Sequence, residues 1–289
     1  MNALRIVRTV AELRQAVSGW RAAGERVALV PTMGALHAGH VSLVELARTK
    51  ARRVATSIFV NPTQFAPHED FAKYPRTFEA DVAKLAAVGC DLVFAPEPAQ
   101  MYPDGFATTI SLDGPAKAGL EDAVRPTHFA GVATVVAKLL IQAAPDVAVF
   151  GEKDYQQLAV IRRMARDLDL PVEIIGAPTM REPDGLAMSS RNVYLSAAER
   201  AAAPALHRAL LECAARLAKG EAFGAALSEG RAAIERAGFA LDYLELRDAG
   251  SLAPVTSAAK WPLRLLVAAR IGSTRLIDNI AAGAAAQEG

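Results

Sequence analysis

An alternation of apolar runs and helical segments in the N-terminal part of the chain most constrains its fold. The apolar runs predict buried strands, and they are Val27–Val30, Val54–Val60, Leu92–Ala95, Val147–Phe150 and Val172–Ile175. Apolar residues at helical spacing predict helices, and these segments are Thr9–Gly24, which opens with a capping-box pattern, His40–Arg53, Thr77–Val88, Phe129–Ala143 and Tyr155–Leu168. Strands that alternate with helices form βαβ units, so we expect an α/β fold with a doubly wound parallel sheet.

The C-terminal part has a different texture and predicts a second, smaller α+β domain. Ala-rich segments predict helices and apolar segments predict strands, namely helices at Ala197–Ala218 and Phe223–Ala237 and strands at Leu241–Leu246, Leu265–Ala269 and Leu276–Ile280. Pro178, Pro183 and Gly185 cluster between the two parts and indicate a boundary there. We therefore expect one domain over residues 1–180 and another over 181–289.

Composition and charge exclude several classes of protein. The chain has 289 residues, of which 52% are hydrophobic and 22% charged, which is typical of a globular protein and not of a disordered one. Lys and Arg number 32 against 31 Asp and Glu, a net charge of +1, whereas a nucleic-acid binder usually carries a basic excess. We therefore expect no nucleic-acid partner.

Cysteine usage and hydropathy indicate the compartment. Cys90 and Cys213 lie far apart and form no C-x-x-C pair, which fits a reducing cytoplasm. Arg5, Arg8 and Glu12 interrupt the start of the chain, and no apolar run approaches the roughly 18 residues that cross a bilayer. We expect a cytoplasmic protein with no membrane segment.

Ligands of open α/β sheets bind beyond the carboxyl ends of the strands, so the segment Pro31–His40 is the first candidate site. It carries His37, Gly39 and His40 at the start of a helix, where unpaired N–H groups attract an anion and glycine allows close approach. The imidazoles could donate hydrogen bonds to phosphate oxygens. An H-x-x-H pair can equally be two surface histidines, and a metal site would need a third ligand.

A second segment, Asn61–Phe65, follows the next predicted strand. Gln64 could orient a hydroxy acid, although turn composition alone explains Asn and Pro at such a place. The polar stretch that continues to Arg76 could act as a mobile lid over a reactive intermediate.

Two later segments combine charged and hydroxyl groups. In Gly151–Gln157, Lys153 suits a phosphate and Asp154 a ribose hydroxyl, while a helix-capping role for Asp154 is the alternative. Met188–Asn192 couples two hydroxyls to a guanidinium, which suits a polyphosphate but also describes a capped turn. P-loop, G-x-G-x-x-G, G-x-S-x-G and H-E-x-x-H patterns do not occur in the sequence, so it offers no sign of the usual dinucleotide, serine-hydrolase or zinc sites.

The segments His37–His40 and Met188–Arg191 resemble the paired HIGH and KMSKS elements of the nucleotidyl-transferring superfamily, which activates substrates on the α-phosphate of ATP. Six ordered motifs narrow this resemblance to the pantoate:beta-alanine ligase (pantothenate synthetase) family. The motifs are Pro31–His40, Phe59–Phe65, Tyr74–Arg76, His128–Val132, Gly151–Gln157 and Met188–Asn192.

The resemblance implies a Rossmann-like sheet of the HIGH type and a C-terminal domain that closes over the site. It implies an ATP-dependent ligase of pantothenate and coenzyme A biosynthesis that works through a pantoyl adenylate and releases AMP and pyrophosphate. Mg²⁺ would accompany ATP and be held mainly by its phosphates, with no protein metal ligand. The substrates would be ATP, pantoate and beta-alanine, and the protein would be a homodimer.

The resemblance also implies roles for individual residues. His37, His40, Lys153 and Arg191 would be catalytic, Gln64 and Gln157 would bind pantoate, and Gln64 would also bind beta-alanine. The residues that would bind ATP are Met33, Gly34, Ala35, Leu36, His37, Ala38, Gly39, His40, Gly151, Glu152, Lys153, Asp154, Met180, Met188, Ser189, Ser190 and Arg191.

Two other functions remain open on the residues alone. A nucleotidyltransferase would stop at adenylyl or cytidylyl transfer and leave the nucleotide on its product, whereas the ligase releases free AMP. A regulatory module would bind ATP without releasing pyrophosphate. An aminoacyl-tRNA synthetase is disfavoured by the size of the chain and by the missing basic excess.

Overall fold

The computed structural model describes residues 4–65, 71, 74–255 and 262–282. The chain divides into two compact units. The first unit contains Met1–Glu152 and Val160–Pro178, and the second contains Lys153–Ala159 and Thr179–Gly289. The short segment Lys153–Ala159 therefore belongs with the C-terminal part, although it lies within the N-terminal part of the sequence.

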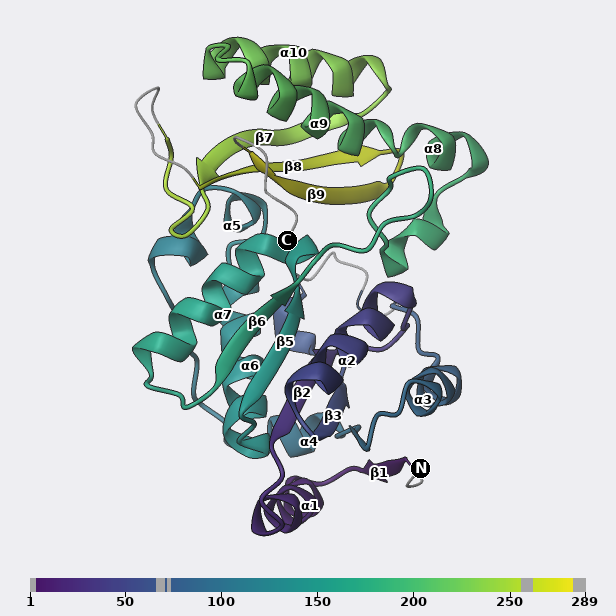
Figure 1. Cartoon of the computed structure of the whole chain (residues 1–289), viewed down its shortest axis with the longest axis vertical. Coiled ribbons are helices and arrows are strands. Elements are labelled where there is room, and N and C mark those ends of the chain that lie inside the picture. The colour runs from purple at the N-terminus through teal and green to yellow at the C-terminus, as the bar shows by residue number, and fades with distance from the viewer. Residues whose placement is uncertain (1–3, 66–70, 72–73, 256–261, 283–289) are drawn as a thin grey trace. The chain divides into compact units, whose positions relative to one another are not determined.

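The first unit is built on a six-stranded parallel sheet in the order β1-β4-β3-β2-β5-β6 (Figure 1). Its strands are β1 (Arg5–Val7), β2 (Val27–Thr32), β3 (Arg53–Ile58), β4 (Leu92–Phe94), β5 (Val147–Gly151) and β6 (Glu173–Ala177). Without the edge strand β1, this is the 3-2-1-4-5 arrangement of a Rossmann-like sheet. The predicted α/β fold with a doubly wound parallel sheet is confirmed.

The strand order reverses between β2 and β5, which pair directly at Ala28–Val147 and Leu29–Ala148. In such sheets the crevice at this switch point receives the ligand. The segments that leave the carboxyl ends of these two strands begin at Met33 and Glu152. Both belong to segments that the sequence marks as candidate sites.

The N-terminal strand β1 is absent from the sequence prediction, which takes Val27 as the start of the first strand. Only three residues pair with β4, and two of them, Arg5 and Ile6, are exposed. So short and open an edge strand leaves no buried apolar run to detect.

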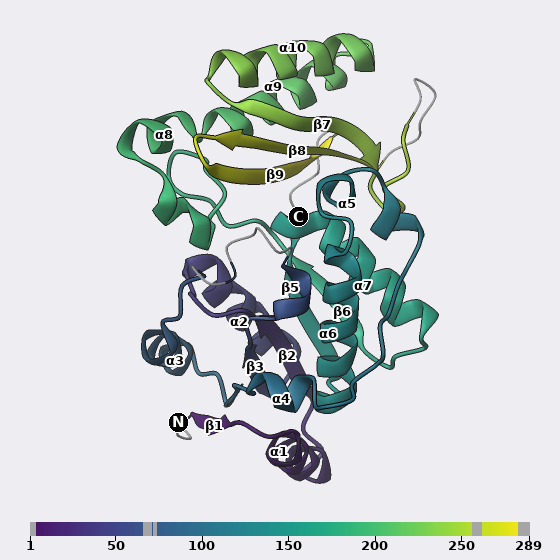
Figure 2. The ribbon, with the colours of Figure 1, turned by 180° about the vertical axis from the view of Figure 1, so that it is seen from behind.

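Helices cover both faces of the parallel sheet. The helices up to residue 167 are α1 (Val10–Ala22), α2 (Ala38–Lys50), α3 (Phe78–Ala87), α4 (Pro98–Met101), α5 (Glu121–Val124), α6 (His128–Ala143) and α7 (Tyr155–Asp167), the last of which begins in the second unit. Helix α2 lies in front of the sheet in Figure 1, and α6 lies in front of it when the molecule is turned round in Figure 2. The predicted capping box of α1 is confirmed, because the Thr9 side chain accepts the Glu12 N–H while the Glu12 side chain accepts the Thr9 N–H.

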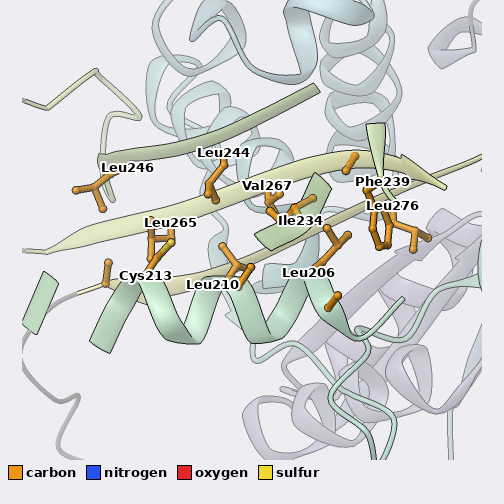
Figure 3. Close-up of a cluster of buried hydrophobic side chains, with 14 of the residues drawn as sticks. Leu206, Leu210, Cys213, Ile234, Phe239, Leu244, Leu246, Leu265, Val267 and Leu276 are labelled. Carbon is orange, nitrogen blue, oxygen red and sulfur yellow. The ribbon is translucent and has the colours of Figure 1, made fainter. Parts of the chain in front are cut away.

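The second unit is a three-stranded antiparallel sheet with helices on one side. Its strands are β7 (Ala240–Asp248), β8 (Leu263–Ile271) and β9 (Thr274–Ala282), in that order, and its helices are α8 (Ala197–Ala202), α9 (Ala205–Ala218) and α10 (Phe223–Arg236). Figure 3 shows Leu206 and Leu210 of α9 lying against Leu265 and Val267 of β8 in a shared apolar core. The predicted smaller α+β unit is confirmed.

The single helix predicted over Ala197–Ala218 is wrong, because the structure has two helices there. Helix α8 ends at Ala202 and α9 begins at Ala205, with Pro204 as its N-cap. Proline has no backbone N–H and cannot continue the hydrogen-bond ladder of the first helix.

Two findings bear on the expected compartment. In the described ranges no helix is both long enough and apolar enough to cross a bilayer. Cys90 and Cys213 are both buried free thiols.

Candidate active site

The loop that follows β2 has an unusual backbone path. Gly34 has φ of 82° and the next residue, Ala35, has φ of 51°, so two successive residues lie in the left-handed region. Such a conformation is rare outside glycine and needs support from the surroundings. The Thr32 hydroxyl gives part of that support, since it donates to the Ser57 carbonyl at 2.7 Å and accepts the Gly34 N–H at 3.3 Å.

Asp81 of α3 supplies the rest of the support. Its carboxylate is fully buried and accepts the N–H groups of Ala35 and Leu36 at 2.9 and 2.8 Å. The Thr77 hydroxyl donates to the same carboxylate at 3.1 Å, and the Lys84 ammonium donates to the Leu36 carbonyl at 2.5 Å. Helix α3 and its N-cap thus hold the loop on which His37 stands, and no sequence motif pointed to Asp81.

His37 and His40 stand at the start of α2 with their ring centroids 4.1 Å apart. His37 is the N-cap, and its Nδ1 accepts the Gly39 N–H at 3.1 Å. The Nδ1 atom of His40 accepts the His37 N–H at 3.3 Å. A neutral imidazole that accepts at Nδ1 carries its proton on Nε2, so each ring has a donor at its far nitrogen.

The capping by His37 also explains where α2 begins. The sequence prediction starts this helix at His40, whereas the structure starts it at Ala38. Histidine is not among the residues expected at an N-cap, so the pattern gave no signal for the earlier start.

Gln64 lies at the end of a 3₁₀ turn, Pro62–Gln64, that follows β3. Its Oε1 accepts from Asn61 Nδ2 at 3.1 Å, and its Nε2 contacts the Met33 sulfur at 3.0 Å. Asn61 is 1% exposed, and its Oδ1 accepts from the Tyr102 hydroxyl at 2.7 Å. The amide of Gln64 is therefore oriented next to the loop that carries the histidines.

The backbone of Gln64 is held as well. Its carbonyl oxygen accepts from Arg125 at 3.1 Å and lies 3.0 Å from Nδ1 of His128. Arg125 and the His128 ring also meet each other at 3.2 Å. His128, which the sequence marks only through its motif, thus supports the position of Gln64.

The polar stretch from Asn61 to Arg76 is described only in part. Residues 66–70 and 72–73 lie outside the described residues, so the predicted lid stays a prediction. Asn61 caps the turn that follows it by accepting the Thr63 N–H at 3.3 Å, which is the ordinary turn role that the sequence also allowed.

In the second unit, Lys153 stands on the 3₁₀ turn Glu152–Asp154 that leads into α7, and Gln157 stands in the first turn of α7. The side chain of Lys153 is 21% exposed, and its Nζ lies 3.8 Å from Oδ1 of Asp154. The Lys153 carbonyl accepts from Asn279 Nδ2 at 2.8 Å. Gln157 is half-buried, and its neighbour Gln156 is buried.

Met180 and Met188 lie opposite each other on a hairpin of the same unit. The Met188 N–H donates to the Met180 carbonyl at 3.0 Å, and Arg181 bridges to Ala187 in antiparallel fashion. The chain then enters a 3₁₀ turn, Ser190–Tyr194, in which the Ser189 hydroxyl accepts the Arg191 N–H at 3.3 Å. Ser189 therefore has the capping role that the sequence allowed as its alternative.

The structure thus gathers the predicted site residues into two groups. Met33–His40, Gln64 and Gly151–Glu152 belong to the first unit, and the rest belong to the second. The second group consists of Lys153, Asp154, Gln157, Met180, Met188, Ser189, Ser190 and Arg191. In the part of the chain that the structure describes, no three His, Cys, Asp or Glu side chains are grouped to hold a metal ion.

Comparison with known proteins decides the family. The family model for pantoate-beta-alanine ligase matches residues 5–281. The chain belongs to the pantoate-beta-alanine ligase family. The family resemblance found in the sequence is confirmed, and the chain is a ligase that condenses pantoate and beta-alanine with ATP.

Relatives of this ligase family match almost the whole chain. Pantothenate synthetase of Rhodopseudomonas palustris (strain HaA2) is 62% identical over 276 residues, which are 96% of this chain and 98% of that protein. The solved pantothenate synthetase of Thermus thermophilus is 51% identical, with a TM-score of 0.90 over 96% of this chain and 98% of that one.

A third relative was solved with ligands. The pantoate-beta-alanine ligase of Francisella tularensis, complexed with beta-gamma ATP and beta-alanine, is 33% identical with a TM-score of 0.80. The match covers 96% of this chain and 98% of that one.

Proposed function

We propose that the chain makes pantothenate in two steps through a pantoyl adenylate. In the first step a pantoate carboxylate oxygen attacks the α-phosphorus of ATP, the bond to the bridging oxygen breaks, and pyrophosphate leaves. In the second step the amine of beta-alanine, after losing a proton to solvent, attacks the acyl carbon and the bond to AMP breaks. The carboxylate is ionised near neutral pH, so the first step requires alignment and charge neutralisation rather than a base.

The observation that carries this proposal is the pair of imidazoles at the start of α2. Because both Nδ1 atoms accept backbone N–H groups, His37 and His40 present Nε2 donors beyond the carboxyl end of β2. Donors fixed before the reaction stabilise the charge that develops on phosphate oxygens in the transition state. His40 takes the role of the family's catalytic histidine.

Both groups of site residues bind the same ATP in this proposal. Met33–His40 and Gly151–Asp154 hold the nucleotide, with Lys153 on a phosphate and Asp154 on the ribose. The hairpin and turn that carry Met180 and Met188–Arg191 close over adenine and phosphates. Lys153 and Arg191 supply positive charge, and a Mg²⁺ ion bound to the phosphates neutralises further charge when it is present.

Amide side chains bind the two smaller substrates. Gln64 and Gln157 offer both donors and acceptors, which match the hydroxyls and carboxylate of pantoate. Gln64 also lies near beta-alanine. Support comes from the oriented amide of Gln64, held by Asn61 at 3.1 Å, and from the Francisella relative that was solved with beta-alanine.

Two further parts of the proposal concern the protein as a whole. We place it in the cytoplasm, in agreement with its two buried free cysteines. We also propose a homodimer, which rests on the family resemblance.

The test exploits the different reach of two amides at position 40. In His40→Asn the amide stands near the Nδ1 position, whereas in His40→Gln it extends towards the Nε2 position. Pyrophosphate release from ATP and pantoate should fall about 100-fold in His40→Asn, as for loss of one transition-state donor, and clearly less in His40→Gln. Equal losses in both variants would contradict a role for the Nε2 donor.

The two steps are separated by supplying the intermediate. With preformed pantoyl adenylate and beta-alanine, His40→Asn should recover much of its amide-forming rate. If it stays as slow on the adenylate as on ATP, then the assignment of His40 to the first step is wrong.

A further inference from the structure

The dipeptide Asp278–Asn279 of β9 consists of two polar residues inside the second unit. Asp278 is 5% exposed and Asn279 is 2% exposed. Successive side chains of a strand point to opposite faces of its sheet, so the two residues reach in opposite directions. Buried polar side chains are nearly always hydrogen-bonded, so the hydrogen-bond partners of Asp278 and Asn279 identify the segments that these side chains fix in place.

Asp278 holds the hairpin that carries Met180 and Met188. Its carboxylate accepts two hydrogen bonds from the Arg181 guanidinium, at 2.7 and 2.9 Å. Arg181 also donates to the Gly185 carbonyl at 3.0 Å, at the turn of this hairpin. A two-pronged pair of this kind fixes both position and orientation, because the planar guanidinium matches the carboxylate at two points.

Asn279 holds the segment that carries Lys153. Its Nδ2 donates to the Lys153 carbonyl at 2.8 Å. Its Oδ1 accepts from Arg264 at 2.7 Å, which leaves one rotation of the amide that suits both partners. Arg264 also lies over the ring of Tyr155, at 4.1 Å from the ring centroid, two residues beyond Lys153.

We propose that Asp278 and Asn279 are positioning residues that fix the two ATP-binding segments of the second unit in one frame. This inference rests on the proposed function of Lys153 and of the hairpin. Asp278 binds the Arg181 side chain and Asn279 binds the Lys153 main chain. The two residues are adjacent in β9, so no flexible linker separates them. The main chain at Lys153 and the Met180–Met188 hairpin are therefore held at a constant separation when ATP arrives.

Pre-organisation of this kind lowers the cost of binding, because the protein does not have to order the two segments around the nucleotide. A small displacement of a charge-bearing group from its productive place reduces the rate strongly. Loss of the Asp278–Arg181 contact or of the Asn279–Lys153 contact should therefore weaken ATP binding and slow adenylate formation.

The experiment is a double-mutant cycle on the full-length chain, with ATP affinity as the readout. Asn279→Ala should weaken ATP binding about 10-fold when Lys153 is present. In a Lys153→Ala background the same substitution should change the affinity less than about twofold, since the group that it positions is gone. A general loss of structure would weaken binding by the same factor in both backgrounds, and that result would overturn the proposal.

A control and a second variant make the result specific. Asp242 pairs with Arg275 at 2.6 Å in the same sheet and touches neither ATP segment, so Asp242→Asn should leave ATP affinity unchanged. If Asn279→Ala weakens ATP binding no more than Asp242→Asn, the proposal is wrong. Should Asn279→Ala fail to fold, Asn279→Asp replaces it, because it keeps the acceptor for Arg264 but cannot donate to the Lys153 carbonyl.

The contact of Asp278 with Arg181 is tested separately with Asp278→Asn, which keeps the shape of the side chain but removes its charge. This variant should weaken ATP binding even in the Lys153→Ala background, because it acts on the hairpin and not on the lysine. Full ATP affinity in Asp278→Asn would overturn that half of the inference. If Lys153→Ala alone binds ATP normally and forms adenylate at the usual rate, the proposed function of Lys153 fails first.

Discussion

Removal of the Asp81 carboxylate should loosen the loop that carries His37 and His40. In Asp81→Ala the N–H groups of Ala35 and Leu36 lose a charged acceptor inside the protein, where water does not replace it. A hydrogen bond to a charged group contributes about 1.5–3 kcal/mol, so two of them amount to about 3–6 kcal/mol. A typical domain has only about 5–15 kcal/mol of stability, so the variant should be much less stable yet still fold under mild conditions.

The matched control is Asp122, whose carboxylate also accepts two backbone N–H groups, those of Gly119 and Leu120, both at 3.0 Å. This site is partly open to solvent, so water can take over both bonds when Asp122 is removed. Asp122→Ala should therefore lower the free energy of unfolding by about 1 kcal/mol, as for loss of an exposed cap. The comparison tests the effect of burial on the backbone bonds, because each carboxylate accepts two backbone N–H groups.

Urea denaturation gives the free energies of unfolding, and pyrophosphate release with ATP and pantoate gives the effect on the first step. Asp81→Asn serves as a milder variant, since it keeps the shape but turns one oxygen into a donor that faces a backbone N–H. Both Asp81 variants should lose pyrophosphate release even where they remain fully folded. Equal unfolding free energies for Asp81→Ala and Asp122→Ala, or full activity in folded Asp81→Asn, would refute the reasoning.

Two other predictions concern packing and pH. An added Cβ at Gly131 would lie 2.4 Å from the Thr63 carbonyl oxygen, so Gly131→Ala should cost about 1–3 kcal/mol of stability and, by displacing Gln64, raise the KM for pantoate. In the control variant Gly224→Ala the added Cβ has nothing within 4 Å, so urea denaturation and initial rates should show neither effect. Burial lowers the pKa of His207 below 6.5, so the unfolded chain binds a proton more readily and the free energy of unfolding falls as pH drops through 6.5, by at most about 1.4 kcal/mol per unit. His207→Gln should reduce that fall. If the free energy of unfolding differs between about pH 7.5 and about pH 5.5 by the same amount in His207→Gln as in the unmodified protein, the assignment to His207 is wrong.

Local patterns predicted most of the secondary structure and the main candidate segments. Periodicity placed β2, α2 and β5, and the switch-point rule then indicated the segments that begin at Met33 and Glu152. These signals are local because each depends on residues within a few turns of helix or a single strand. Where the pattern was short or its end was capped unusually, as at β1 and at His37, the prediction failed.

Contacts between distant parts of the sequence were outside the reach of such patterns. Asp81 lies 46 residues from Ala35, and Asn279 lies 126 residues from Lys153. An Asp on a helix or an Asn in a strand carries no local pattern that predicts which distant main-chain amide or carbonyl it will bind. Only the folded chain shows that these two residues support the predicted site.

Asp81 and Asn279 share a property that explains why motifs alone do not define this site. Each side chain ends on main-chain atoms of a motif: Asp81 on the amides of Ala35 and Leu36, and Asn279 on the carbonyl of Lys153. Every residue of these motifs has a main-chain carbonyl, and every non-proline residue has an N–H, so the residue types in a motif do not reveal that its main chain is held by a distant side chain. Ala35 takes part through its amide and its φ of 51°, and the carboxylate that accepts from that amide lies on the helix α3, 46 residues further along the chain. The geometry of the histidine and lysine motifs is consequently a property of α3 and β9 as much as of the motifs themselves.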